Sequence, residues 1–156
     1  MNKLYLLALL PIVAGCQSTA PVASTQIEHI NPPTMIDTSA MGYSQVVTAT
    51  GGKLIFLAGQ GPTNPNEKSA KDLRGQARQA VDNILTGLKE AGAGPEHLVY
   101  LRINVVDYNP RMMLDLAPEI GRLKGADTPP PASVFIGVDS LILPTTKIEI
   151  EAIAAL

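Results

Sequence analysis

Cysteine, tryptophan and histidine are scarce in this chain, which has one Cys, no Trp and two His among 156 residues. A chain with a single cysteine cannot form an internal disulfide, so its folded part depends on an apolar core. With aromatic residues at 4% of the composition, an aromatic platform for stacking nucleic-acid bases is not expected. Two histidines also argue against a histidine-rich metal centre, and we expect neither a metal nor another cofactor.

An excess of charge of one sign is also absent. The chain has 12 basic and 14 acidic residues and a formal net charge of −2. Proteins that bind nucleic acids usually carry a basic patch, so we expect no nucleic-acid partner. Hydrophobic residues, in contrast, make up 46% of the composition, which is enough for the core of one domain.

The single cysteine lies at the end of an apolar N-terminal segment. Lys3 precedes the apolar run 4–14, which is too short to span a bilayer but suits the hydrophobic region of a secretory signal. Residues 13–16 read VAGC and resemble the lipobox of bacterial lipoproteins. This resemblance implies that the Cys16 thiol receives a diacylglycerol, and that residues 1–15 are a signal peptide whose cleavage makes Cys16 the new N-terminus. The alternative is an ordinary signal peptide with a cysteine there by chance.

The residues after the cysteine predict where the protein is held. Gln17 is not the aspartate that usually retains lipoproteins in the inner membrane, so we expect a lipid anchor on the outer membrane, facing the periplasm. Several acyl chains on one terminus bind a bilayer far more firmly than a single chain. The small, polar residues up to 26 predict a flexible tether over 16–26 and a folded domain over 27–156.

The first part of the domain contains two β-rich runs. Runs 46–49 and 53–58 flank Gly51 and Gly52, and because glycine accepts positive φ without strain, this arrangement predicts a hairpin. An additional N-terminal strand is possible.

Two helical regions follow. Ser69 and Asp72 resemble a capping box and predict the start of a long helix, which Gly92 would end. Pro118 interrupts the second region, 109–124, and predicts a kink or two short helices because it removes an amide donor. The buried stripe of the long helix is predicted to be Leu73, Ala77, Val81, Ile84 and Leu88.

Three further strands are predicted at 98–106, 132–138 and 147–154, and the acidic residues of the last share one face. The order β-β-α-β-α-β-β favours an α+β sandwich in which two helices pack on one face of a mixed sheet. More apolar residues alternate along the strands than two helices can cover, so we expect the chain to self-associate.

Several segments together resemble the Rid family, the reactive intermediate deaminases also called the YjgF family. The resemblance covers roughly residues 30–156 and implies a chorismate-mutase-like fold, a homotrimer, and clefts between subunits that bind a small-molecule metabolite. The segments that carry it, in family order, are 42–45, 58–60, 76–84, 131–138 and 148–154.

The family's chemistry depends on two charged residues. An arginine in a Pro-Ala-Arg segment binds the substrate carboxylate of 2-aminoacrylate-type imines, and a glutamate in the last strand orients the attacking water. Here Ser133 stands at the arginine position, and a serine is too short and uncharged to replace the guanidinium fork. Glu149 matches the catalytic glutamate. The chain therefore resembles a subgroup that lacks the substrate-binding arginine, and we expect a pocket that keeps its acid but has no cation.

The resemblance also implies a set of substrate-binding positions. The family's Ser-Gly-Gln triplet is Ala58-Gly59-Gln60 here, which removes a hydroxyl. These implied positions are Tyr43, Ala58, Gly59, Ser133, Phe135 and Gly137.

Each candidate has a structural alternative. Glu149 could be a solvated or salt-bridged residue on the outer face of its strand, and Tyr43 could serve a subunit interface. Arg102 could in principle replace the missing cation, although arginines more often pair with a nearby acid. We expect His97 to be a surface residue, and His29, near the tether, gives no indication of function.

Two functions remain open. The first is a deaminase-like hydrolase acting on small imine- or enamine-like metabolites, in which Glu149 handles the proton. The second is a non-catalytic trimer that binds a small molecule or serves as a scaffold at the cell envelope. The missing arginine argues against activity on 2-imino acids. The absence of a basic groove and of a histidine pair argues against an endoribonuclease.

Overall fold

The computed structural model describes residues 24–63 and 68–156. The predicted signal peptide and the predicted lipidation site, Cys16, lie outside the described residues, as does most of the predicted tether. The described part contains, in chain order, β1 (Gln26–Ile30), β2 (Val46–Thr50), β3 (Leu54–Gln60), α1 (Leu73–Glu90), β4 (Leu98–Val106), α2 (Met113–Ile120), β5 (Ala132–Val138) and β6 (Ile148–Ala155).

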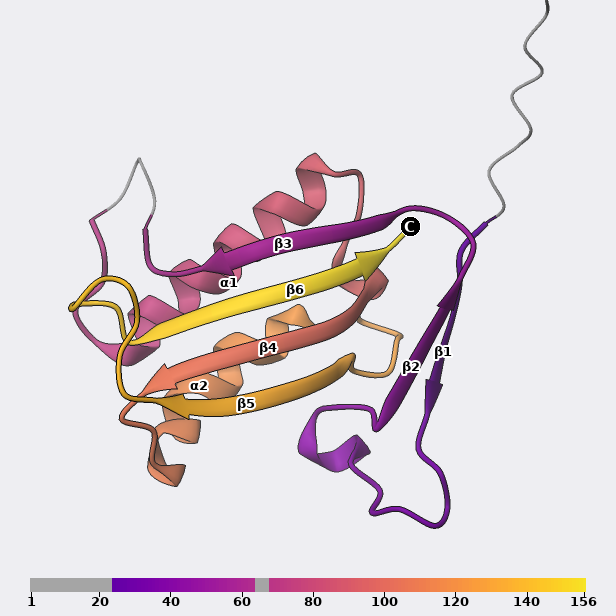
Figure 1. Ribbon diagram of the computed structural model, residues 1–156, viewed down its shortest axis with the longest axis horizontal. Coiled ribbons are helices and arrows are strands. Elements are labelled where there is room, and N and C mark those ends of the chain that lie inside the picture. Colours follow the sequence, from indigo (N-terminus) through magenta and orange to yellow (C-terminus); the bar gives the residue numbers. More distant parts are fainter. Residues whose placement is uncertain (1–23, 64–67) are drawn as a thin grey trace, which may run out of the picture.

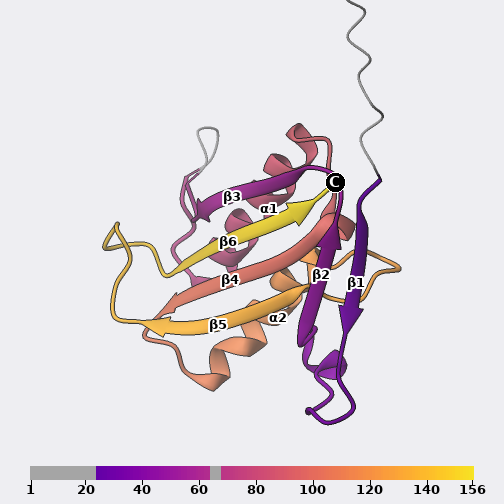
Figure 2. The ribbon, with the colours of Figure 1, turned by 45° about the vertical axis from the view of Figure 1, so that its right-hand side comes forward.

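A four-stranded mixed sheet forms the centre of the fold. Its strand order is β3-β6-β4-β5, with β4 and β5 parallel and the other pairs antiparallel. Both helices lie on one face of this sheet, whereas the other face is uncovered (Figures 1 and 2). The predicted α+β architecture, with a mixed sheet and two helices on one face, is confirmed. None of the helices in the described part is both long and apolar enough to cross a membrane.

Helix α1 supplies one side of the core. Asp72 caps its start by accepting a hydrogen bond from the Gly75 backbone N–H at 2.8 Å, and this bond lowers the pKa of Asp72. The predicted capping box is therefore wrong, because Asp72 is itself the N-cap and Ser69 precedes the helix. Gly92 follows the helix at φ +81°, as predicted. The stripe residues Ala77, Val81, Ile84 and Leu88 are fully buried against the sheet.

The predicted hairpin between the two early strands is wrong. β2 pairs with β1, while β3 pairs with β6 in the other sheet. Gly51 and Gly52 both have positive φ, and they form the corner at which the chain passes from one sheet to the other (Figure 1). Lys53 exchanges backbone hydrogen bonds with Leu156, and a Cβ at Gly52 would overlap the Leu156 carbonyl. Because Gly52 has no side chain, Leu156 at the C-terminal end of the chain has room to pair with this segment.

Pro118 does not divide the second helical region into two α-helices. It lies inside α2, which is only eight residues long and continues at both ends as 3₁₀ turns, Pro110–Met112 and Gly121–Leu123. The amide that Pro118 lacks would have faced the carbonyl of Leu114, an exposed residue, so water can replace that bond.

A buried glutamine joins α1 to the segment that enters β6. Gln76 is 2% exposed, donates to the carbonyl oxygens of Ala70 (3.0 Å) and Thr145 (2.9 Å), and accepts from the Lys147 amide (2.7 Å).

We expect Gln76→Ala to lower the free energy of unfolding by about 1–3 kcal/mol, since it leaves buried backbone groups without partners. Urea denaturation measures this loss, with exposed Gln26→Ala as the control. Equal midpoints for the two variants would show that these hydrogen bonds contribute nothing to stability.

Candidate functional site

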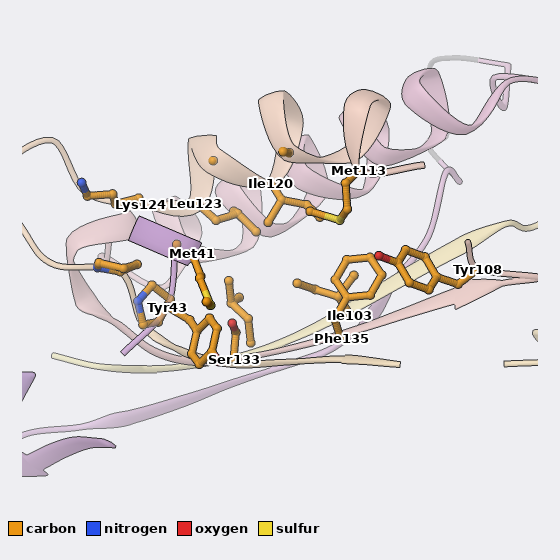
Figure 3. Close-up of a pocket in the computed structure, with 16 residues that line it drawn as sticks. Met41, Tyr43, Ile103, Tyr108, Met113, Ile120, Leu123, Lys124, Ser133 and Phe135 are labelled. Atoms are coloured by element: carbon orange, nitrogen blue, oxygen red, sulfur yellow. The ribbon is translucent and has the colours of Figure 1, made fainter. Parts of the chain in front are cut away.

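A pocket lies between α2 and the helix-covered face of the sheet (Figure 3). Its volume of about 380 Å³ is in the range that holds a small ligand. Leu101 and Ile103 of β4 form its floor, and both are almost fully buried. Ile120 of α2 and Leu123 of the following 3₁₀ turn form the opposite wall. Most of the pocket surface is therefore apolar.

Two predicted site residues, Tyr43 and Ser133, lie at one end of this pocket. Tyr43 comes from the segment that joins β1 to β2, and Ser133 comes from β5. Figure 3 shows them beside each other, with Met41 next to them.

The opposite end of the pocket is aromatic. The rings of Tyr108 and Phe135 pack against each other with their centroids 4.9 Å apart. Figure 3 shows Met113 above this pair. Gly137 lies just beyond the pair, where a Cβ would stand 3.3 Å from the Cβ of Tyr108. Phe135 thus lines the pocket, while Gly137 leaves room for Tyr108.

The segment that contains Tyr43, between β1 and β2, is hydrogen-bonded to the loop that precedes β5. The Ser44 hydroxyl donates to the Pro130 carbonyl at 2.6 Å, and the Ser44 amide donates to the Pro131 carbonyl at 3.1 Å. His29 Nδ1 lies 3.1 Å from the Pro130 carbonyl and must donate to it, since a carbonyl only accepts. His29 therefore has a structural role that its position near the tether did not indicate.

The remaining candidates, Glu149 and the segment 58–59, lie elsewhere. Glu149 pairs in register with Asn104, whereas Ser133 pairs with Leu101. Residues paired across neighbouring strands share a face of the sheet. Because Leu101 belongs to the buried core, Ser133 lies on the helix-covered face and Glu149 on the uncovered face. One protomer therefore does not bring the predicted catalytic acid and the predicted substrate pocket together.

Gly59 lies directly against Glu149. A Cβ at Gly59 would stand 2.6 Å from Cδ of Glu149, closer than real atoms approach. The pairing of β3 with β6 also shifts register between Leu57 and Gln60. Gly59 therefore contacts Glu149, and the missing side chain at Gly59 leaves room for the Glu149 carboxyl group.

Arg102 cannot serve the pocket of its own protomer. It pairs in register with Glu151 and Val134, so that it lies on the uncovered face, and it is exposed. The idea that Arg102 replaces the missing arginine is therefore wrong within one protomer.

A lysine that the sequence analysis did not identify lies at the pocket mouth. Among the described residues that line the pocket, Lys124 has the one charged side chain. Figure 3 places it at the end where Met41 and Tyr43 lie. The expectation of a pocket without a cation is thus wrong. Lys124 directly follows the 3₁₀ turn Gly121–Leu123 and belongs to none of the segments that resemble the Rid family, so no sequence pattern marked it.

Metal ligands are not gathered in the described residues. Within residues 24–63 and 68–156, no three or more His, Cys, Asp or Glu residues lie close enough together to hold a metal ion.

The fold and the sequence are both similar to known proteins. Residues 35–156 match the family model described as endoribonuclease L-PSP. No curated protein matches the chain. The crystal structure of YyfB from Yersinia pestis, described as a protein of unknown function of the Rid family, shares 36% identity and has a TM-score of 0.77. The match covers 83% of this chain and 98% of YyfB, so a crystallised relative consists of little more than the matched region.

Two other solved structures have the same fold. Rv2704 from Mycobacterium tuberculosis, a member of the YjgF family, is 26% identical over 85% of this chain and all of its own, with a TM-score of 0.56. TdcF from Escherichia coli, solved with bound serine, is 21% identical over 67% of this chain and 82% of its own, with a TM-score of 0.57. The family match and the identity to YyfB establish that the chain belongs to the endoribonuclease L-PSP family, the YjgF/Rid family, and has its chorismate-mutase-like fold.

Proposed function

We propose that this protein binds a small metabolite in the pocket between α2 and β5 and hydrolyses an imine or enamine with the help of Glu149 from a neighbouring copy. The observation that carries the proposal is the placement of Ser133 and Glu149 on opposite faces of one sheet. A complete site then requires two copies of the chain. This matches the clefts between subunits that the family resemblance implies.

The uncovered face supports self-association. Phe56 is 72% exposed on β3, and its neighbour Leu54 is 57% exposed. Val134 on β5 adds a further exposed apolar side chain on the same face. Burying such residues against another copy is favourable, so we propose a homotrimer with its ligand sites between subunits.

The proposed reaction needs one proton acceptor near the substrate. Water adds to the carbon of the C=N bond, and the Glu149 carboxylate accepts a proton from that water. That proton passes to the nitrogen and gives a carbinolamine, which carries the new hydroxyl and an amino group on one carbon. The hydroxyl proton is then transferred to the amino group, the C–N bond breaks, and ammonia leaves while the carbonyl forms. An enamine substrate first becomes the imine by protonation at carbon.

A second candidate function is binding without turnover. Ser133 offers a hydroxyl where the family resemblance implies an arginine, and the pocket floor and wall are apolar. Such a pocket could hold a metabolite in a trimer that only binds or serves as a scaffold at the cell envelope. RNA cleavage is not proposed, since the described pocket lining includes one cation and no histidine.

A metabolite screen by thermal shift, run on the parent protein and on Glu149→Gln, tests both functions. A compound that stabilises both proteins and is converted only by the parent supports the hydrolase. Binding to both without conversion by either supports the binding protein. If nothing stabilises the parent, the pocket is not a ligand site.

We also propose that the protein is attached to the outer membrane, facing the periplasm, through a lipid on Cys16. The support is the VAGC run at 13–16 after an apolar segment, followed by Gln17. In this arrangement residues 1–15 are removed, 16–26 form the tether, and 27–156 form the Rid-like domain.

Growth with an alkyne-labelled fatty acid tests the anchor. We expect the purified protein to carry the label and the membrane fraction to contain it. Cys16→Ser should lose the label and leave the membrane, whereas Ser18→Ala should behave as the parent. An unlabelled parent protein would contradict the lipid anchor.

A further inference from the structure

We propose that Lys124 binds the anionic head of an amphipathic ligand, an apolar body that carries one carboxylate, at the mouth of the pocket between α2 and β5. The proposal rests on the small-molecule function proposed for this pocket, and it adds the ligand class and the residue that selects it.

The pocket interior suits an apolar body. Leu101 and Ile103 are each 3% exposed and form a floor without polar side-chain atoms. Leu123 covers them from the other side, and the Tyr108–Phe135 pair closes the far end. An apolar chain of several carbons, placed between these surfaces, would be removed from water, which favours binding in proportion to the area buried.

The charge at the mouth selects an anion. Lys124 has no acidic partner among the described residues, and its side chain is exposed. Figure 3 shows its ammonium nitrogen at the outer end of the side chain, away from the other labelled residues. A carboxylate at the mouth could therefore contact the ammonium while it keeps part of its hydration, and so avoids the cost of a buried charge.

Two neutral groups could add hydrogen bonds at the same end. Ser133 and Tyr43 both line this end of the pocket, and each hydroxyl can donate to a carboxylate oxygen. A lysine on a flexible stem, together with hydroxyls, tolerates more head-group geometries than a planar guanidinium does. The ligand is therefore distinguished by its apolar body and single charge.

Calorimetric titration with octanoate and with uncharged octan-1-ol tests the proposal. The purified protein should lack residues 1–19, which removes no described residue. We expect octanoate to bind at least about tenfold more tightly than octan-1-ol. Lys124→Met keeps the apolar stem and should weaken octanoate about tenfold without affecting octan-1-ol. Lys124→Arg should keep the preference for octanoate, and Lys89→Met, a change outside the pocket lining, should behave as the parent.

A pocket-narrowing variant, Ala117→Trp, separates failure of this proposal from failure of the proposed function. If both probes bind the parent equally, Lys124→Met changes nothing and Ala117→Trp blocks both, the pocket binds small molecules but Lys124 does not select anions. That result overturns this inference alone. If neither probe binds the parent, or if Ala117→Trp leaves binding unchanged, both the inference and the pocket's assignment as the ligand site are wrong.

Discussion

Replacing Glu149 with glutamine is expected to slow hydrolysis of a bound imine or enamine by at least about a hundredfold while leaving its affinity within about twofold. The amide keeps the shape of the carboxyl group but cannot accept the proton from water. Gly59 leaves room for either side chain, so the fold should be unaffected. Single-turnover measurements with a substrate found in the metabolite screen give the rate.

Glu151→Gln is the matched control for this loss. Glu151 lies two residues further along β6 and on the same face of the sheet, where it pairs with Arg102. Its replacement removes the same charge from the same strand, and the rate should change by less than about threefold. If both variants turn over as fast as the parent, Glu149 is not the base, and the protein uses other groups or only binds its ligand.

Little or no acceleration of 2-iminopropionate hydrolysis is expected from the parent protein, and Ser133→Arg should raise the rate at least about tenfold. This substrate is small, so burial of its few apolar atoms contributes little binding free energy. Its binding therefore depends on hydrogen bonds and charge interactions with its carboxylate. A guanidinium supplies two charge-assisted hydrogen bonds in one plane, which a serine cannot. The Ser133 position lines the pocket, so the introduced arginine would point into the space that holds the substrate.

The assay should use freshly generated 2-iminopropionate, with release of the keto acid followed over time. Ser133→Gln adds length and a polar end without charge and should stay at the level of the parent. Robust activity of the parent would show that the missing arginine is not limiting, and that Lys124 or another group binds short carboxylates well.

The limits of two strands were predicted closely from the sequence. The limits 98–106 and 132–138 agree with β4 and β5, and the stripe on α1 is the one that the helical spacing predicts. Both signals are local, since side-chain direction repeats every two residues in a strand and every 3.6 in a helix. The pairing of β3 is not local. Its partner, β6, lies at the other end of the chain, and the two glycines before β3 are compatible with either a hairpin or a corner.

The candidate site was predicted in part. The positions with a family counterpart were identified, but the faces to which they belong depend on strand register across the whole sheet. Ser133 and Glu149 therefore looked like members of one pocket, although one chain places them on opposite faces. Lys124 was missed because a lone lysine after a helix has no pattern, and only the packing of α2 against the sheet brings it to the pocket mouth.

A crystal structure of the protein with bound octanoate tests the central claim, that the ligand lies between α2 and β5 and that a second copy completes the site. We expect the apolar chain to lie over Leu101 and Ile103, with the carboxylate within hydrogen-bond reach of Lys124. We also expect Glu149 of an adjacent copy to point into the same pocket. An empty pocket at saturating octanoate, or an assembly in which Glu149 faces solvent far from every pocket, would contradict it.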